Sequence, residues 1–417
     1  MKSIFRQILN SIKQGKYYLF STAIDVVAIF IFNLLIARSF DPAIYGQIKT
    51  VLAVTAIFLA AFDLGLPVLL QNESAKGKTL DSLGLVLFIK LVSVFLYSAF
   101  VLLYFAFTSP DIDFIIVSLV LLSSYLMSFC SLLFSLFYGK DKISYTFNSI
   151  FVSRALLLLV SLLLTKLNTS VYYFLVVFLL NYLTQLVILA YESKKIGVSL
   201  KLNNKSIKDS LKLIKAIFPL ALTTLFCTLY SKLDVVLVAR YLNFDSVAQY
   251  NIPYGIYKLS GIVFTSFTIP AFNAFSRNEN IQSNFKILRS NIYIMIVVSI
   301  LIDLGILLLG KEMIILLYGD KYLLASEIMP YFSVSVLGLG LNSITGVYCN
   351  ALRKYKVTLF TTLGGIIVNV FLNVILIPRT GVMGAVYSSM VTEMFVFAGQ
   401  YYYIKQHILK PSLHITS

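Results

Sequence analysis

Nine charged side chains lie inside long apolar stretches of this 417-residue chain. A charge at the centre of a membrane costs several kcal/mol, so such residues usually face other protein groups or a watery cavity. Structural ion pairs would explain one or two of them, whereas nine together indicate a polar path. The cations are Lys90, Arg154, Lys232 and Lys258, and the carboxylates are Asp25, Asp63, Asp234, Asp303 and Glu393.

The two kinds of charge predict different chemistry. Ammonium and guanidinium groups bind phosphate directly, so the four cations suit an anionic substrate. The five carboxylates suit either proton exchange during transport or pairing with the cations, and the sequence leaves both roles open. We therefore predict that the cations bind the substrate, and that the carboxylates line the cavity or couple transport to an ion.

The apolar stretches that carry these charges are each about 20 residues long, which is the length that a helix needs to cross a membrane core of ~30 Å. Hydrophobic residues make up 59% of the chain, and the mean hydropathy is +0.88. The stretches are continuously apolar instead of alternating, so they predict helices and not a β-barrel. The twelve predicted spans are residues 17–38, 50–70, 82–107, 113–137, 144–165, 171–191, 213–238, 247–272, 290–310, 326–350, 357–377 and 383–404.

The net charge of +16 follows from the loops between these spans. Lys and Arg accumulate in cytoplasmic loops of membrane proteins. With the N-terminus inside, the inner segments hold 23 of the 34 Lys and Arg residues, and the outer loops and span ends hold 7. This bias predicts that both termini are cytoplasmic, and it explains the positive charge without a nucleic-acid partner.

A polar interval at residues 192–215 divides the chain into two predicted lobes, residues 1–200 and 201–417, with six spans each. A shift of 202 residues places Ala37-Arg38 on Ala239-Arg240 and Gln47 on Gln249. An even number of spans keeps the two lobes in the same orientation. The sequence therefore predicts a parallel duplication, with the binding site between the lobes near the middle of the membrane.

Several classes of protein are excluded by what the sequence lacks. The only histidines, His407 and His414, lie in the C-terminal tail, so a zinc site or a His-based catalytic site is not expected. The largest predicted outer loop, residues 311–325, is too short to carry a catalytic apparatus. We expect no cofactor and no metal, and we expect the chain not to be an enzyme.

Several segments resemble the polysaccharide-unit flippases of the O-antigen type, in the multidrug/oligosaccharidyl-lipid/polysaccharide exporter superfamily. The resemblance covers nearly the whole chain, although Ala248 stands where that family often has glycine. The matching segments are Asn33–Gly46, Asp63–Gly65, Lys232–Asp234, Ala248–Tyr250, Leu316–Gly319 with Tyr322, and Gly381–Ala385 leading to Glu393.

The resemblance implies a MATE-like, V-shaped pair of six-helix lobes around a cavity that opens alternately to the two sides. It implies movement of an undecaprenyl-pyrophosphate-linked oligosaccharide from the inner to the outer leaflet of the bacterial cytoplasmic (inner) membrane, for O-antigen, lipopolysaccharide or capsule synthesis. A polysaccharide polymerase and chain-length proteins are then expected partners, beside the lipid bilayer. Helices 1, 2, 7 and 8 line the cavity in such proteins, which favours Asp25, Asp63, Lys232, Asp234 and Lys258.

Three alternatives stay open at this point. A multidrug or cation antiporter of the related branch would need net negative charge in its cavity. A lipid-II-type flippase would be longer, with two additional helices. An integral-membrane enzyme would need a catalytic group of residues at a membrane surface.

Overall fold

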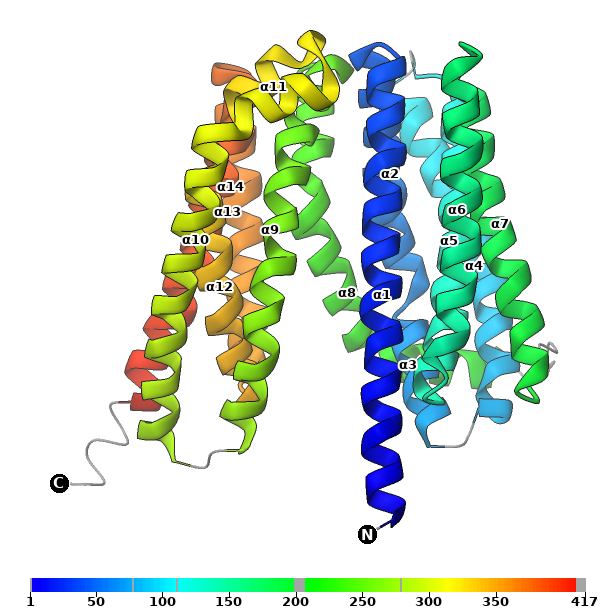
Figure 1. Ribbon diagram of the computed structural model, residues 1–417, viewed down its shortest axis with the longest axis vertical. Helices are drawn as coiled ribbons and strands as arrows, with labels where there is room; N and C mark the ends of the chain where they lie inside the picture. The colour runs from blue at the N-terminus through cyan, green and yellow to red at the C-terminus, as the bar shows by residue number, and fades with distance from the viewer. Residues whose placement is uncertain (1, 77–78, 110–111, 199–206, 278–279, 410–417) are drawn as a thin grey trace. The chain divides into compact units, whose positions relative to one another are not determined.

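The computed structural model describes residues 2–76, 79–109, 112–198, 207–277 and 280–409, and in these ranges all regular structure is helical (Figure 1). Twelve of the described helical segments are long and apolar enough to cross a membrane. The predicted all-α fold with twelve spans is therefore confirmed, and the chain is a multi-pass membrane protein. Its contacts divide it into two compact units, which we call unit 1 and unit 2.

Unit 1 consists of Met1–Asp41 and Val51–Thr228. Helix α1 packs on α6, while α5 packs on both α3 and α7, so that a layer of apolar side chains fills the space among them. Its helices are α1 (Lys2–Ser39), most of α2 (Pro42–Asp63), α3 (Leu66–Ala75), α4 (Thr79–Thr108), α5 (Phe114–Gly139), α6 (Ile143–Lys166), α7 (Val171–Lys195) and the first part of α8 (Ile207–Tyr241).

Unit 2 consists of Pro42–Thr50 and Leu229–Ser417. Helix α12 is its centre and packs on α9, α10 and α14, and α13 packs on α14. Helices α2 and α8 thus each contribute to both units, and the lobes 1–200 and 201–417 stay a prediction. The remaining helices are α9 (Phe244–Arg277), α10 (Ile281–Tyr318), α11 (Leu323–Ile328), α12 (Ser333–Ala351), α13 (Tyr355–Thr380) and α14 (Val382–Tyr403), which ends in a π-helical turn, Ile404–Leu409.

The helix bounds repeat at the offset that the sequence repeat predicts. Helix α8 ends at Tyr241, 202 residues after the end of α1 at Ser39. Helix α9 begins at Phe244, 202 residues after the start of α2, and ends at Arg277, 202 residues after the end of α3. One continuous helix in the second half therefore corresponds to two helices in the first half.

The break between α2 and α3 corrects the second predicted span, 50–70, because α2 covers Pro42–Asp63 instead. Leu64 and Gly65 both have left-handed backbones, with φ of 52° and 68°. A left-handed residue after the last helical turn is a common way to end a helix, and glycine adopts it at little cost. Pro67 lies in the first turn of α3, where its missing N–H is not needed. Hydropathy alone did not register this break, since the residues around it are apolar.

The predicted outer loop 311–325 is also corrected, because most of it is helical. Helix α10 continues to Tyr318, a 3-10 turn covers Asp320–Tyr322, and α11 follows at once. Gln249 of α9 holds this segment through both ends of its amide: Nε2 donates to the Lys321 carbonyl at 2.9 Å, and Oε1 accepts from the Ala325 backbone N–H at 3.0 Å.

Candidate functional site

Lys90 and Asp63 form an ion pair inside unit 1. Lys90 projects from α4 and also donates to the hydroxyl of Ser128 on α5. The lysine side chain is 1% exposed, whereas that of Asp63, at the end of α2, is 16% exposed. The buried ammonium group therefore has both of its partners within the unit.

Arg154 forms the second ion pair between helices of unit 1. From α6, its Nε donates to Oδ1 of Asp25 on α1 at 2.7 Å, and its Nη1 donates to Oδ1 of Asn181 on α7 at 2.6 Å. The guanidinium carbon lies 5.0 Å from the ring centroid of Tyr182. Arg154 is 4% exposed but Asp25 is 41% exposed, so in this pair the carboxylate is accessible and the cation is buried.

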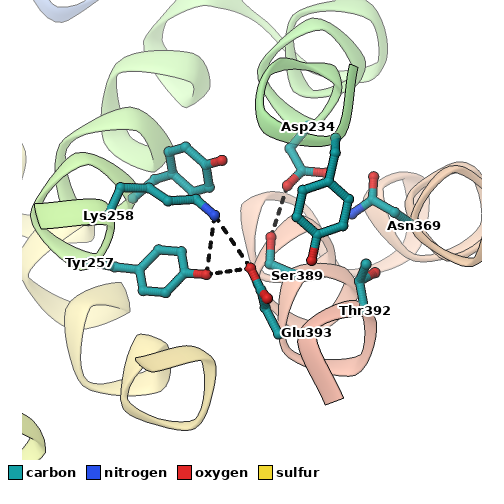
Figure 2. Close-up of a pocket in the computed structure, with 9 residues that line it drawn as sticks. Asp234, Tyr257, Lys258, Asn369, Ser389, Thr392 and Glu393 are labelled. Carbon is teal, nitrogen blue, oxygen red and sulfur yellow. Dashed lines mark hydrogen bonds and ion pairs between the residues drawn. The ribbon is translucent and has the colours of Figure 1, made fainter. Parts of the chain in front are cut away.

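Glu393 of α14 is the centre of a polar cluster in unit 2 (Figure 2). It accepts from Tyr257 Oη at 2.8 Å, from Lys258 Nζ at 3.3 Å and from Asn342 Nδ2 at 3.1 Å. Gly338 of α12 lets α14 approach at this level, since a Cβ there would lie 2.7 Å from that of Glu393.

Lys258 is the exposed partner of this pair. Its side chain is 30% exposed while that of Glu393 is 3% exposed. Its Nζ lies 4.7 Å from the ring centroid of Tyr257 and 5.3 Å from that of Tyr254. Nζ also donates to Tyr257 Oη at 3.3 Å. Aromatic faces attract an ammonium group without neutralising its charge, so Lys258 is held by Glu393 and the tyrosines while its side chain stays partly exposed.

Asp234 of α8 is buried, and none of its hydrogen bonds in the described part of the chain comes from a cation. It accepts from Asn373 Nδ2 at 2.7 Å, from Ser389 Oγ at 2.8 Å and from Tyr250 Oη at 3.0 Å. Figure 2 shows Asp234 and Glu393 on opposite sides of one small cavity. Its volume of about 10 Å³ is near the lower limit for one ordered water, so the two carboxylates belong to one closely packed cluster.

Lys232 and Lys49 extend this cluster with positive charge. Lys232 of α8 is exposed and lies close enough to both Lys258 and Lys49 to interact with their charges. It has no ion pair in the part of the chain that the structure describes. Lys49 belongs to unit 2 through its stretch of α2, and its Nζ lies 5.0 Å from the ring centroid of Tyr45. Three lysines therefore gather in unit 2.

Sequence reasoning missed Lys49, which was counted with the outer loops and span ends because the second span was placed too late. The repeat held the signal, since a shift of 202 places Lys49 on Asn251, inside the predicted span 247–272. It also missed the neutral residues that hold the two carboxylates, which are Tyr250, Tyr257, Asn342, Asn373 and Ser389.

The predicted site residues therefore fall into separate places. Lys232, Asp234, Lys258 and Glu393 come together in unit 2, while Lys90 with Asp63 and Arg154 with Asp25 form two pairs in unit 1. Asp303 of α10 joins none of these groups: its buried Oδ1 has no hydrogen-bond partner among the described residues. Among those residues no three His, Cys, Asp or Glu side chains are placed to hold a metal ion.

Comparison with known structures supports the fold. The lipid II flippase MurJ in its inward closed conformation is similar over 95% of this chain and 88% of MurJ, at 16% identity and a TM-score of 0.74. An inward-facing multidrug resistance MATE family transporter of the MOP superfamily is similar over 94% of this chain and 96% of its own, at 12% identity and a TM-score of 0.74. The eukaryotic MATE transporter AtDTX14 matches over 97% and 98%, at 11% identity and a TM-score of 0.61. The expected MATE-like architecture is thus confirmed.

Comparison with sequence families gives the closer assignment. The family described as polysaccharide biosynthesis protein (Polysacc_synt) matches residues 11–279, and the MatE family matches residues 219–378. A search of curated proteins found no match. The first match covers well over half of the chain, and it agrees with the resemblance that the sequence motifs carry. The chain therefore belongs to the polysaccharide biosynthesis protein family.

Proposed function

We propose that this protein is a flippase for a lipid-linked oligosaccharide, which it moves from the inner to the outer leaflet of a bacterial cytoplasmic membrane by alternating access. The carrier is undecaprenyl pyrophosphate, and the product serves O-antigen or capsule synthesis. The observation that carries the proposal is the group of three lysines in unit 2, Lys49, Lys232 and Lys258.

Lysines that lie within membrane-spanning helices need a nearby anion or water to compensate their charge. A charge within the membrane is costly unless it is paired or solvated, and Lys232 has no ion pair among the described residues. Pyrophosphate carries the opposite charge, and ammonium groups with rotatable donors can replace its hydration. Lys258 keeps its orientation through Glu393 and the surrounding tyrosine rings, and its side chain stays 30% exposed.

Unit 1 supplies the other part of the proposal, which is ion coupling. Asp25 is the most exposed carboxylate of the five ion pairs among the described residues, although it lies within the first span. A carboxylate that is held by Arg154 on one side and open on the other can exchange a proton during the transport cycle. Asp63 is a weaker candidate, since it is mostly covered.

The test is deletion of the protein in its host, followed by a gel of surface polysaccharide and an analysis of membrane lipids. We expect loss of long-chain polysaccharide and accumulation of undecaprenyl-linked repeat units at the inner leaflet. Complementation with Lys232→Ala or Lys258→Ala should fail, whereas Lys311→Ala, an exposed lysine at the far end of α10, should restore the polymer. Normal polymer with both Lys232→Ala and Lys258→Ala, each expressed at wild-type level, would contradict the proposal.

A second candidate is a multidrug or cation antiporter, which the MatE match and the exposed Asp25 favour. Such a protein would use the carboxylate of unit 1 as its cation site, and the lysines of unit 2 would be partners of carboxylates. Expression in a drug-sensitive strain separates the two candidates. Resistance to cationic dyes, lost in Asp25→Asn and combined with normal polysaccharide in the deletion strain, would favour the antiporter.

A further inference from the structure

A second concave site lies between α10 and α14, away from the lysine group. It is a cavity of about 460 Å³, within the size range of small-molecule sites. Four of its residues belong to α10 and two to α14, and the cavity lies wholly inside unit 2. These residues are Phe285, Arg289, Ile292, Tyr293, Phe397 and Tyr401.

The two walls are regular helix faces. On α10 the lining residues follow the spacing of one helical stripe, from Phe285 through Arg289 to Tyr293, and on α14 Phe397 and Tyr401 are one turn apart. The rings of Phe397 and Tyr401 lie 5.7 Å apart between centroids. The cavity is therefore an aromatic groove with a single charge, that of Arg289.

Arg289 has no carboxylate partner within the described residues. Its Nη2 and Nε donate to Tyr293 Oη at 3.3 and 3.4 Å, and its guanidinium carbon lies 5.8 Å from the Tyr293 ring centroid. No ion pair in the described part of the chain includes it. A guanidinium group held against an aromatic ring keeps its outward N–H donors for a bidentate acceptor such as phosphate.

The position of Arg289 along α10 indicates how deep in the membrane the groove lies. Helix α10 has 38 residues, or about 57 Å at the usual rise per residue, so it is longer than a membrane core of ~30 Å. Arg289 is eight residues from its N-terminal end, at the end of the predicted span 290–310. Lys286 and Lys405 are exposed near the same end of unit 2. Arg289 thus lies at headgroup level, in the predicted topology on the cytoplasmic side, where anionic lipids are concentrated.

We propose that this groove binds one anionic phospholipid, with its phosphate on Arg289 and the upper part of an acyl chain along Ile292, Tyr293 and Phe397. The site is independent of the lysine group and does not require the flippase function. Charge complementarity favours this occupant, because the groove offers one cation at headgroup depth and apolar or aromatic surface below it. A zwitterionic lipid would bring its own ammonium group against Arg289 and bind less tightly.

The test is lipid binding by the purified full-length protein, measured by native mass spectrometry with phosphatidylglycerol and phosphatidylcholine as probes. We expect one retained phosphatidylglycerol in the wild type and a preference over phosphatidylcholine. Arg289→Gln should weaken phosphatidylglycerol binding about tenfold, which corresponds to ~1.4 kcal/mol. Lys286→Gln is the matched control, since it removes an exposed cation three residues away that does not line the groove.

Three outcomes would overturn the proposal. Equal losses in Arg289→Gln and Lys286→Gln would indicate general surface attraction instead of a site. Equal retention of the two lipids by the wild type would remove the role of charge. Displacement of phosphatidylglycerol by equimolar undecaprenyl phosphate, abolished in Arg289→Gln, would make the carrier lipid the occupant. Arg289 is exposed, so unchanged thermal stability of the variant in phosphatidylcholine verifies its fold.

Discussion

In the two ion pairs that join different helices of unit 1 the buried member is the cation, whereas in the corresponding pair of unit 2 it is the carboxylate. Lys90 and Arg154 are covered while Asp63 and Asp25 are more open, and Glu393 is covered while Lys258 is open. At these interhelical pairs unit 1 therefore exposes a carboxylate and unit 2 exposes an ammonium group. This difference is the reason for assigning the anionic headgroup, in the proposed function, to unit 2.

The helix framework repeats between the halves, but this chemistry does not. At the offset of 202, Asp25 corresponds to Cys227, Asp63 to Thr265, and Lys258 to Ala56. Helices α1 and α8 end at equivalent residues, as do α3 and α9. The two halves thus share helix ends, while the ion pairs between their helices expose opposite charges.

The largest effect on stability is expected for Asp63→Ala. It leaves the ammonium group of Lys90 buried with only Ser128 as a partner, and breaking a buried pair in this way costs ~3–5 kcal/mol of unfolding free energy. The double variant Asp63→Ala with Lys90→Met should recover most of that loss, because an apolar pair replaces an ionic one. The free energy of unfolding in mixed micelles, measured for the single and the double variant, tests both expectations. No recovery in the double variant would mean that Lys90 has a role besides structure.

A smaller loss is expected for Asp234→Asn in unit 2. The hydroxyls of Tyr250 and Ser389 can rotate to accept from the new amide, but Asn373 Nδ2 can still only donate. The new amide therefore keeps its oxygen toward Asn373 Nδ2, and the loss comes from replacing a charged acceptor by a neutral group, at a cost of about 1–3 kcal/mol. Asn373→Asp in the same chain would supply an acceptor and restore part of the stability. An unchanged unfolding free energy in Asp234→Asn alone would show that Asp234 does not need its charge.

The spans and the charged residues were predictable because both depend on local sequence. A run of about 20 apolar residues predicts a helix whatever its partners are, and a charge within it is conspicuous. The break at Leu64 was not predictable, because it depends on a left-handed backbone in residues that are as apolar as their neighbours. Lys49 was lost with it, because moving the start of α2 to Pro42 places this lysine inside the helix.

The pairing of the charges was not predictable in the same way. Arg154 finds Asp25 across 129 residues and Lys258 finds Glu393 across 135, so the partners depend on which helices pack together. The donors to Asp234 and Glu393 include tyrosine, serine and asparagine, and the chain has 27 tyrosines. A neutral donor carries no signal in sequence until the packing brings it to a carboxylate. The assignment of sites therefore stays a prediction that the variants must test.

Lys258→Ala tests the comparison most directly, with a modest effect on stability and a large effect on transport. Glu393 keeps Tyr257 and Asn342 as donors, so loss of one hydrogen bond costs about 1 kcal/mol. Transport of the pyrophosphate-linked unit, measured by complementation and lipid analysis, should fall tenfold or more, since loss of one charge-assisted contact removes at least ~1.4 kcal/mol of binding. If the variant loses much stability yet transports normally, Lys258 has a structural role like Lys90 in unit 1. The proposed difference between the two units would then be wrong.

The smallest stability effect is expected for Asp25→Asn. The substitution keeps the shape and one oxygen acceptor for Arg154, Asn181 still accepts from the guanidinium, and the side chain is partly exposed. Arg154 is buried but keeps two oxygen acceptors, and the pair meets water at Asp25, so the free energy of unfolding should change by about 1 kcal/mol or less. Transport should instead lose its dependence on the pH gradient, which reconstituted vesicles with an imposed gradient measure. Wild-type dependence in this variant would remove Asp25 as the coupling group, and Asp63→Asn would be the next to test. Loss of coupling with retained stability would give the accessible carboxylate of unit 1 a function that matches the accessible lysines of unit 2: one unit responds to the proton, and the other holds the anion.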